Sequence, residues 1–202
     1  MARWDPDKRW LGSVEIVAKL RANGAKPLLL ARGGREAYGT EVLAAMRNAG
    51  LRVIDRSNPS GDLRGLVQVL DEVGGADVVN LVSHVDPVAR RALFRASDVV
   101  LANSSHEPFG LVGLEAMAVG GIACTGCSGE DYALPGHNAL VLQTSDPDEL
   151  IAQLGQLRAD HGFEESLRRA GRSTARRFAW PEVIRTGLAP RLALLQPQAV
   201  AG

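Results

Sequence analysis

Hydrophobic residues fall into two kinds of segment along the chain. Short apolar runs of strand length, rich in Val, Leu and Ile, alternate with longer stretches in which apolar residues recur at helical spacing. Short turns of Gly, Asp and Asn join them. Strands that alternate with amphipathic helices are typical of βαβ units. The pattern therefore predicts the α/β class, with an open parallel sheet that carries helices on both faces.

The clearest runs indicate where strands and helices should lie. Most apolar runs contain too few polar residues to form sheet edges, so we expect both of their faces to be covered. Asp146 and Pro147 have the pattern of a helix cap followed by proline at the first helical position. The predicted strands are residues 27–31, 51–54, 77–82, 98–101 and 121–124. The predicted helices lie near residues 9–22, 39–49, 62–72, 86–96, 111–119, 147–160, 163–177 and 181–195.

The start of the chain departs from this alternation. Only residues 1 and 2 precede Arg3, and residues 4–8 are predicted to form a loop, so the strand that should open the first unit is nearly absent. This indicates a fragment of a longer protein or the product of a truncated gene. Elsewhere the sequence has no linker, low-complexity tract or internal repeat, and we expect a single domain over residues 1–202.

Composition and charge narrow the range of functions. Hydrophobic residues make up 46% of the chain and charged residues 23%, as in soluble globular proteins. Lys and Arg total 23, as do Asp and Glu, so no overall field favours nucleic acid or an anionic membrane. The sequence shows neither an apolar signal region nor an apolar run of transmembrane length. We therefore expect a cytoplasmic protein in which any anion site is local.

Cys124 and Cys127 have the spacing of half a zinc site or of a redox pair. A structural zinc ion takes four ligands. No second cysteine pair or histidine pair at ligand spacing follows, and His84, His106 and His137 are scattered. We expect two small, partly buried thiols and no metal ion.

Both common glycine-rich phosphate loops are missing from the sequence. No two glycines stand two residues apart, which excludes the dinucleotide-binding pattern G-x-G-x-x-G. Gly34 and Gly39 have P-loop spacing, but Thr40 and Glu41 follow where Lys and Ser or Thr would bind phosphate and magnesium. Nicotinamide-dependent and Walker-type functions are therefore disfavoured.

The most informative stretch is residues 101–118, where a predicted strand leads through a short polar loop into a helix. The first turn of a helix offers unpaired N–H groups and the positive end of the helix dipole, which favour a phosphate. Pro108 fixes the entry of the chain, and Gly110 has no side chain to block a ligand. We expect an anion site at this helix start, near Phe109, Gly110 and Leu111.

Two carboxylates flank that helix start, Glu107 in the loop and Glu115 inside the helix. The helical rise places Glu115 roughly 7–9 Å along the axis, too far for the two to share one hydrogen bond. An ionised carboxylate accepts hydrogen bonds from two neighbouring hydroxyl groups. The spacing suits a sugar near Glu107 and a ribose near Glu115, on either side of a diphosphate. An arbitrary Glu is usually a solvated surface charge. For these two glutamates, the surrounding sequence nevertheless favours a binding role.

The two glutamates match the E-x7-E signature of retaining glycosyltransferases of the GT-B fold. That family includes enzymes similar to sucrose-phosphate, trehalose and glycogen synthases, and the chain resembles its C-terminal, Rossmann-like donor-binding domain. The resemblance extends over about residues 3–195. It is carried by residues 107–111, 114–118, Gly120 and loop 125–130, by residues 3–8 as an R-x-D-x-x-K segment, and by aromatic residues in 177–180.

The resemblance implies which residues would take part in catalysis. Arg3 and Lys8 would neutralise the diphosphate, and Glu107 would bind the donor sugar. Fixed cations and helix amides can stabilise the charge that develops on a departing nucleoside diphosphate without a metal ion. We therefore expect a metal-independent hexosyltransferase with no bound cofactor. Taken alone, Arg3 and Lys8 would be ordinary surface charges.

The resemblance places further donor contacts along the same edge of the sheet. The ribose would lie at Glu115, and the phosphates and the sugar edge would lie at the amides of residues 109–111. The nucleobase would lie near Val82 and Ser83, at the carboxyl end of a strand, where open α/β sheets bind ligands. The loop that contains Gly126 would lie beside the donor.

Some features depart from the family pattern. Residues 120–122 are Gly-Gly-Ile where many members have Gly-x-Pro, and residues 137–139 are His-Asn-Ala where many have Asn-x-Gly. From the resemblance we expect the N-terminal GT-B domain, which normally supplies the acceptor site, to be missing from this chain, and a helix in residues 181–202 to pack toward it. His106 is interpreted as non-catalytic, because no partner Ser, Cys or metal ligand is identifiable beside it.

The sequence leaves three candidate functions open. The favoured one is the donor-binding domain of a retaining glycosyltransferase that transfers a hexose, as from UDP-glucose, to an unknown acceptor, with the isolated domain inactive. The alternative is a non-catalytic module or truncated fragment that binds a nucleotide or nucleotide-sugar. A GT-B nucleotide-sugar epimerase is weaker, because residues 107–111 favour the transferases. Sequence upstream of Met1 would separate the first two.

Overall fold

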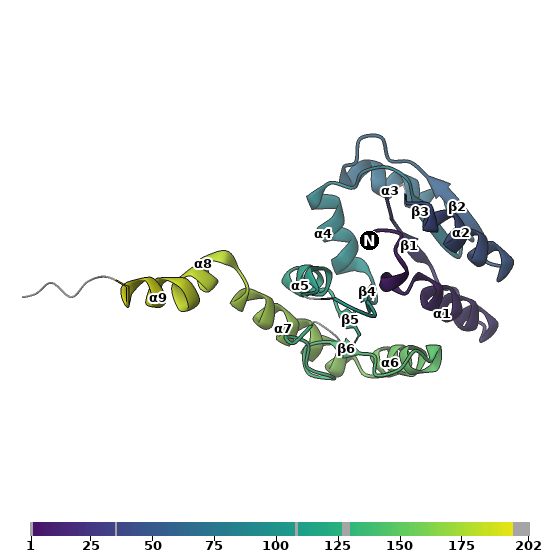
Figure 1. Ribbon diagram of the computed structural model, residues 1–202. Coiled ribbons are helices and arrows are strands. Elements are labelled where there is room, and N and C mark those ends of the chain that lie inside the picture. The colour runs from purple at the N-terminus through teal and green to yellow at the C-terminus, as the bar shows by residue number, and fades with distance from the viewer. Residues whose placement is uncertain (1, 35, 108, 127–129, 196–202) are drawn as a thin grey trace, which may run out of the picture.

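The computed structural model describes residues 2–34, 36–107, 109–126 and 130–195 (Figure 1). Parallel strands alternate with helices through this part of the chain, and helices cover both faces of the strands, so the predicted α/β class is confirmed. The described strands pair in two three-stranded sheets rather than in one continuous sheet. Their orders are β1-β3-β2 and β4-β5-β6.

Each of the five predicted strands overlaps an observed one. A sixth, β6, is two residues long and was not predicted. In the first sheet Leu29 of β1 and Val53 of β2 both pair with Val78 of β3, and in the second Cys124 pairs with Leu140. The strands are β1 Leu29–Ala31, β2 Val53–Arg56, β3 Val78–Leu81, β4 Val100–Ala102, β5 Ala123–Thr125 and β6 Leu140–Val141.

Several helices begin at aspartate caps. Asp62 and Asp86 accept hydrogen bonds from the amides of Gly65 and Ala89, and Asp146 accepts one from Asp148, as the Asp-Pro pattern predicted. The helices are α1 Trp10–Ala22, α2 Tyr38–Asn48, α3 Leu63–Asp71, α4 Pro87–Ala96, α5 Leu111–Ala118, α6 Pro147–Ala159, α7 His161–Arg177, α8 Trp180–Val183 and α9 Ala189–Ala193.

The first sheet has an apolar core on each face. Val78 packs with side chains of α1 and α2, among them Val14 and Met46. Val79, the next residue of β3, packs with α3 and α4 through residues such as Leu66. Because successive side chains of a strand point to opposite faces, the continuous apolar run of β3 fits a strand covered on both sides.

The second sheet follows the same rule. Cys124 of β5 packs with α6 and with Leu167 of α7 on one face. Ala123 packs with α5 on the other face, in a cluster that also contains Met117 and Phe94. These cores position the start of α5 at the carboxyl end of β4, where the candidate site lies.

The segment before α1 is more ordered than the loop predicted for residues 4–8. Residues Pro6–Lys8 form a 3-10 turn, η1, and Arg9 follows with φ 49°, in the left-handed region that side chains other than Gly rarely adopt. Trp4 and Trp10 are both buried, with ring centroids 4.2 Å apart. Two buried indoles therefore hold this segment against the body of the protein.

The C-terminal part of the described chain extends away from the sheets (Figure 1). After α7, the helix α8 continues through a π-helical turn, η2 Ile184–Leu188, into α9. Trp180, Leu188 and Leu192 are exposed along this segment. The expectation that it packs against a further domain stays a prediction. Within the described residues, no helix combines the length and the apolarity that crossing a bilayer requires.

Candidate functional site

The candidate site is a small cavity at the carboxyl end of β4, beneath the N-terminal segment. It has a volume of about 140 Å³. This is less than half of the smallest typical ligand pocket of about 300 Å³, so it can enclose only part of a nucleotide-sugar. The predicted site residues among those that line it are Arg3, Lys8, Glu107 and Gly110.

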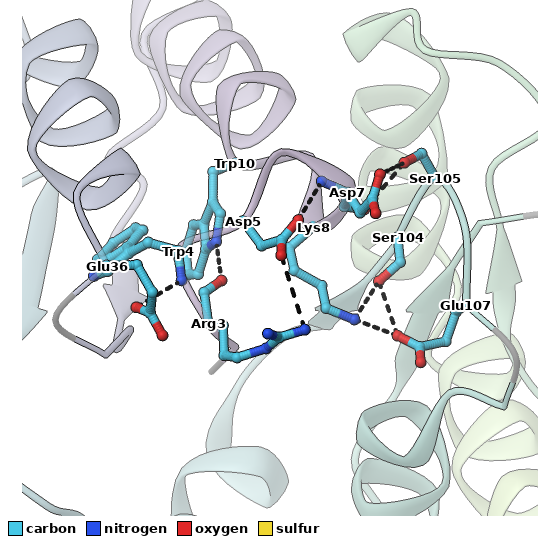
Figure 2. A network of polar contacts seen from close by, with 10 residues as sticks. All are labelled: Arg3, Trp4, Asp5, Asp7, Lys8, Trp10, Glu36, Ser104, Ser105 and Glu107. Carbon is cyan, nitrogen blue, oxygen red and sulfur yellow. Dashed lines mark hydrogen bonds and ion pairs between the residues drawn. The ribbon is translucent and has the colours of Figure 1, made fainter.

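Lys8 and Glu107 both line this cavity, and their side chains point toward each other (Figure 2). The Lys8 ammonium group is ion-paired with the Glu107 carboxylate and donates a hydrogen bond of 3.3 Å to the hydroxyl of Ser104. Side-chain exposure is 22% for Lys8 and 21% for Glu107, so solvent screens the pair less than a surface pair. An ammonium group has three donors, and these two partners take two of them.

The N-terminal segment is fixed at several points, which positions Lys8. The indole N–H of Trp10 donates to the carbonyl of Arg3 at 2.8 Å, and the amide of Trp4 donates to the Glu36 carboxylate at 3.2 Å. Hydrogen bonds from the amide of Glu36 itself and from the amide of Trp4 lower the pKa of the Glu36 carboxyl group. Across the cavity, the amide of Ser105 donates to the carbonyl of Asp7 at 2.7 Å. The turn that carries Lys8 is therefore tied to the loop that carries Glu107.

Arg3 lies at the rim of the cavity. Its side chain is 73% exposed, and within the described ranges its one ion pair is with Asp5 at 3.8 Å, a contact of the kind that contributes little at a surface. The guanidinium group is therefore available to an anion that approaches from solvent.

The start of α5 has the form expected of an anion site. Gly110 is the N-cap and has no side chain, so it offers no side-chain acceptor to the first amide N–H groups of the helix. The hydroxyl of Tyr132 donates to the carbonyl of Gly110. A Cβ on Gly110 would lie 2.4 Å from a carboxylate oxygen of Glu130, so any larger residue here would displace the Glu130 side chain. Pro108 lies outside the described residues.

Phe109 and Leu111 flank this N-cap and are both exposed. The ring of Phe109 packs edge-on against Tyr132 and tilted against Phe178, with centroids 5.8 Å and 5.7 Å apart. Phe178 follows α7, so the aromatic segment near the C-terminus contacts the start of α5. Leu111 is the first residue of the helix and does not line the cavity.

Glu130 is a site residue that sequence analysis did not single out. Its side chain is buried, and neither carboxylate oxygen has a hydrogen-bond partner among the described residues. Burial, together with repulsion from Glu107, raises the pKa of Glu130 to about 7, although Lys8 opposes the shift. Ser104, which lines the same cavity, was also missed. Both Glu130 and Ser104 follow the carboxyl end of a strand, and this position in the sequence could have identified them as site residues.

Glu115 lies apart from this cavity. It is on α5, its side chain is 41% exposed, and it forms an ion pair of 3.4 Å with Arg90 of α4. The structure therefore brings Lys8 and Glu107 together but does not place Glu115 in direct contact with them. Its assignment to a ribose stays a prediction.

The remaining predicted residues lie near the ends of β3 and β5. Val82 is exposed directly after β3, and the hydroxyl of Ser83 accepts a hydrogen bond of 2.7 Å from the amide of Asn58. Gly126 follows β5, and a Cβ there would lie 2.7 Å from the carbonyl oxygen of Ser104. The close approach of these two loops explains the glycine. No contact in the described residues assigns a base or phosphate to any of them.

In the described part of the chain, no group of three or more His, Cys, Asp or Glu side chains could hold a metal ion. Cys124 is a free, buried thiol, and burial raises its pKa to about 12. Cys127 lies outside the described residues.

The chain is similar to known glycosyl transferases. Residues 2–174 match the family model described as glycosyl transferases, group 1. D-inositol 3-phosphate glycosyltransferase of Xylanimonas cellulosilytica is 38% identical over 101 residues, which are 48% of this chain and 24% of the relative. The same-named enzyme of Segniliparus rotundus is 30% identical over 164 residues, 80% of this chain and 36% of the relative.

Solved structures share the fold. Sucrose-phosphate synthase from Thermosynechococcus elongatus superposes with a TM-score of 0.65 at 23% identity, covering 96% of this chain and 44% of that one. Anabaena Alr3699/HepE in complex with UDP and glucose gives 0.67 at 17% identity, covering 95% and 46%. The C-terminal domain of a glycosyl transferase group 1 protein, LpcC, from Francisella tularensis gives 0.60 at 17% identity, covering 86% and 80%.

The chain matches only part of the length of each curated relative. The matched part of the chain spans 24% and 36% of the lengths of the two curated relatives described above. The family match, by contrast, includes the N-terminal segment, the loop with Glu107 and all of α5. The chain belongs to the group 1 glycosyl transferase family.

Proposed function

We propose that this chain is the donor-binding domain of a retaining glycosyltransferase and that it binds a nucleoside-diphosphate hexose, with UDP-glucose as the first candidate. The whole protein would transfer the hexose to an acceptor bound mainly by another domain. The chain by itself would bind the donor without transferring the sugar.

One observation carries this proposal. Lys8, Glu107 and the uncapped start of α5 meet at a single cavity, although Lys8 and Glu107 are 99 positions apart in the sequence. A cation and free helix amides suit a diphosphate, and a carboxylate suits sugar hydroxyls. The cavity thus combines the two recognition chemistries that a nucleotide-sugar requires.

The residues would act as follows. Lys8 would use its remaining N–H donor on the diphosphate, and Arg3 would approach the same group from the rim. Their positive charge, together with the amides at the start of α5, would stabilise the nucleoside diphosphate as the bond to the sugar breaks. Glu107, held by Lys8 and Ser104, would orient the sugar through its hydroxyl groups.

The choice of donor is supported by the names of structural neighbours. The Anabaena protein is described in complex with UDP and glucose, and another neighbour is an α,α-trehalose-phosphate synthase (UDP-forming) from Burkholderia xenovorans in complex with glucose-6-phosphate. Val82 and Ser83 at the end of β3 would receive the base. The alternative, a non-catalytic binding module, uses the same pocket and differs only in the reaction.

Titration calorimetry on the chain tests the proposal. UDP, UDP-glucose, GDP, GDP-mannose and ADP are titrated into the wild type and into Lys8→Met. We expect one class of nucleotide to bind and Lys8→Met to weaken it. Absence of binding to every nucleotide and nucleotide-sugar would contradict the donor-binding function. Adding UDP-glucose and assaying for released UDP then tests whether the chain alone hydrolyses or transfers the sugar, which we expect it not to do.

A further inference from the structure

Glu130 brings a buried carboxyl group to the candidate site without a hydrogen-bond partner for it. Only 6% of the residue is exposed, and neither side-chain oxygen has a partner among the described residues. The residue lines the same cavity as Lys8 and Glu107. A buried polar group without a partner is rare in folded proteins, because its lost hydrogen bonds to water are not replaced. The carboxyl group is therefore available to a ligand that enters the cavity.

The Glu130 carboxyl group lies against the start of α5. A Cβ on Gly110, the N-cap residue, would lie 2.4 Å from one carboxyl oxygen and 2.9 Å from the carboxyl carbon. The helix amides that favour a phosphate begin at this N-cap. Within the described part of the chain, none of these amides donates to Glu130. A diphosphate bound at the start of α5 would therefore lie beside this carboxyl group.

Groups of both signs surround Glu130. Glu107, in the loop after β4, adds a negative charge, and Lys8 of η1 opposes it. Arg3 lines the rim of the same cavity, whereas the start of α5 contributes no charged side chain to the lining. In the loop of Glu130 itself, Tyr132 donates its hydroxyl to a backbone carbonyl, and burial raises the pKa of that hydroxyl. With burial, these neighbours bring the pKa of Glu130 to about 7, so the group is partly protonated at neutral pH.

An incoming diphosphate favours one of the two forms. An ionised Glu130 would repel phosphate oxygens, whereas a protonated carboxyl group can donate a hydrogen bond to an anion. We propose that Glu130 takes up one proton from solvent when the nucleotide-sugar binds, and that the protonated carboxyl group donates a hydrogen bond to a diphosphate oxygen. This inference rests on the proposed function, because it needs a diphosphate in the cavity. Donor binding and proton uptake would then be a single coupled event.

Titration calorimetry on the wild type tests the proposal. UDP-glucose is the probe, or GDP-mannose if the wild type binds guanine nucleotides, because neither ligand changes its own protonation near neutral pH. Titrations at pH 7.5 in HEPES and in Tris, which differ in ionisation enthalpy, give the number of protons taken up. We expect roughly 0.5–1 proton for each nucleotide-sugar bound. We also expect the affinity to fall by up to about tenfold for each pH unit above 7.5.

Two variants assign the proton to Glu130. Glu130→Gln keeps a side chain of similar shape that can donate a hydrogen bond but cannot take up a proton. It should bind the nucleotide-sugar without proton uptake, and its affinity should change by less than about twofold between pH 6.5 and 8.5. Asp131→Asn is the matched control, because Asp131 is the next residue, is exposed and does not line the cavity. Its proton uptake should equal that of the wild type.

Carbon NMR on protein labelled at the glutamate carboxyl carbons follows the same group without a substitution. One resonance should titrate near pH 7 in the free protein and keep its protonated chemical shift at pH 8 in the complex. Nucleotide-sugar binding without proton uptake would overturn the proposal and would assign an ionised Glu130 to sugar hydroxyls. Equal proton uptake in the wild type and in Glu130→Gln would also overturn it. Absence of all nucleotide-sugar binding would overturn the proposed function as well, so the two failures are distinguishable.

Discussion

The ammonium group of Lys8 is ion-paired with the carboxylate of Glu107, and the pair joins η1 to the loop after β4. Because both side chains are largely buried, removing one partner leaves the other charge poorly solvated. The pair therefore contributes to the fold around the site as well as to the proposed complex, and variants at either position need a stability measurement beside each affinity.

Lys8→Met should weaken nucleoside-diphosphate binding by about 10- to 100-fold, the effect of losing one charged hydrogen bond of about 1.5–3 kcal/mol. Titration calorimetry with UDP checks this, and circular dichroism verifies that the variant is folded at the titration temperature. Lys19→Met is the matched control, because Lys19 forms its ion pair with Asp148 on the surface, away from the cavity. Equal loss of affinity in both variants would remove Lys8 from the site.

Substitutions of Glu107 and Glu115 should change ligand affinity in different ways. Glu115→Ala should weaken UDP and UDP-glucose alike, by about 1–3 kcal/mol, because the ribose is common to both. Glu107→Ala should leave UDP nearly unchanged and remove the extra affinity that the glucose provides. Four calorimetric titrations measure this, with Glu15→Ala on the exposed side of α1 as the control. If both variants weaken UDP equally, or neither has an effect, the model of a bracketed diphosphate is wrong.

Glu130 should make stability depend on pH. Its pKa rises from 4.5 to about 7 on folding, so between these pH values the folded state holds a proton that the unfolded state has released. The free energy of unfolding should therefore fall as pH rises from about 4.5 to 7, on the order of 2 kcal/mol, and Glu130→Gln should remove this slope. Urea denaturation at several pH values measures it. A slope that persists unchanged in Glu130→Gln would assign it to other groups.

Nucleotide binding should not require a divalent metal, because Arg3, Lys8 and the start of α5 can supply the positive charge. UDP affinity should be the same, within a factor of about two, in EDTA and in millimolar magnesium or manganese. Calorimetry in the two buffers measures this. Binding that disappears on chelation would show that a metal ion is part of the site.

Cys124 should be unreactive in the native protein, because burial raises its pKa to about 12 and the thiolate is the reactive form. Iodoacetamide at pH 8, followed by peptide mass spectrometry, should label Cys124 only after denaturation. Metal analysis of protein purified without chelators should show no stoichiometric zinc. Rapid labelling of native Cys124, or one zinc ion per chain, would contradict the interpretation of an inert thiol.

Much of the fold could be predicted because apolar runs and caps are local signals. The run at residues 77–82 and the Asp146–Pro147 cap both identified elements that the structure contains. The two-residue strand β6 gave too short a pattern to recognise. The burial of Trp4 could not be predicted either, because it depends on Trp10 and on residues that only the folded chain brings near.

Some residues of the candidate site could likewise be predicted from the sequence, and others could not. Lys8, Glu107 and Gly110 could be identified because they belong to motifs with fixed spacing, and they line one cavity. Glu130 could not, because a loop glutamate is ordinarily solvated and its burial results from packing against the N-cap of α5. The ion pair between Glu115 and Arg90 could not be predicted from the sequence either, because it depends on how α4 and α5 pack together.

The buried tryptophan pair allows the segment beside the candidate site to be followed by spectroscopy. Trp4 and Trp10 lie on either side of η1 with their rings 4.2 Å apart, whereas Trp180, the third tryptophan of the chain, is 77% exposed. Indoles this close are expected to couple electronically and to give a circular dichroism couplet. A soluble quencher such as acrylamide should reach Trp180 far more readily. Spectroscopy on the unlabelled protein can therefore follow the segment that carries Lys8 separately from the C-terminal helices.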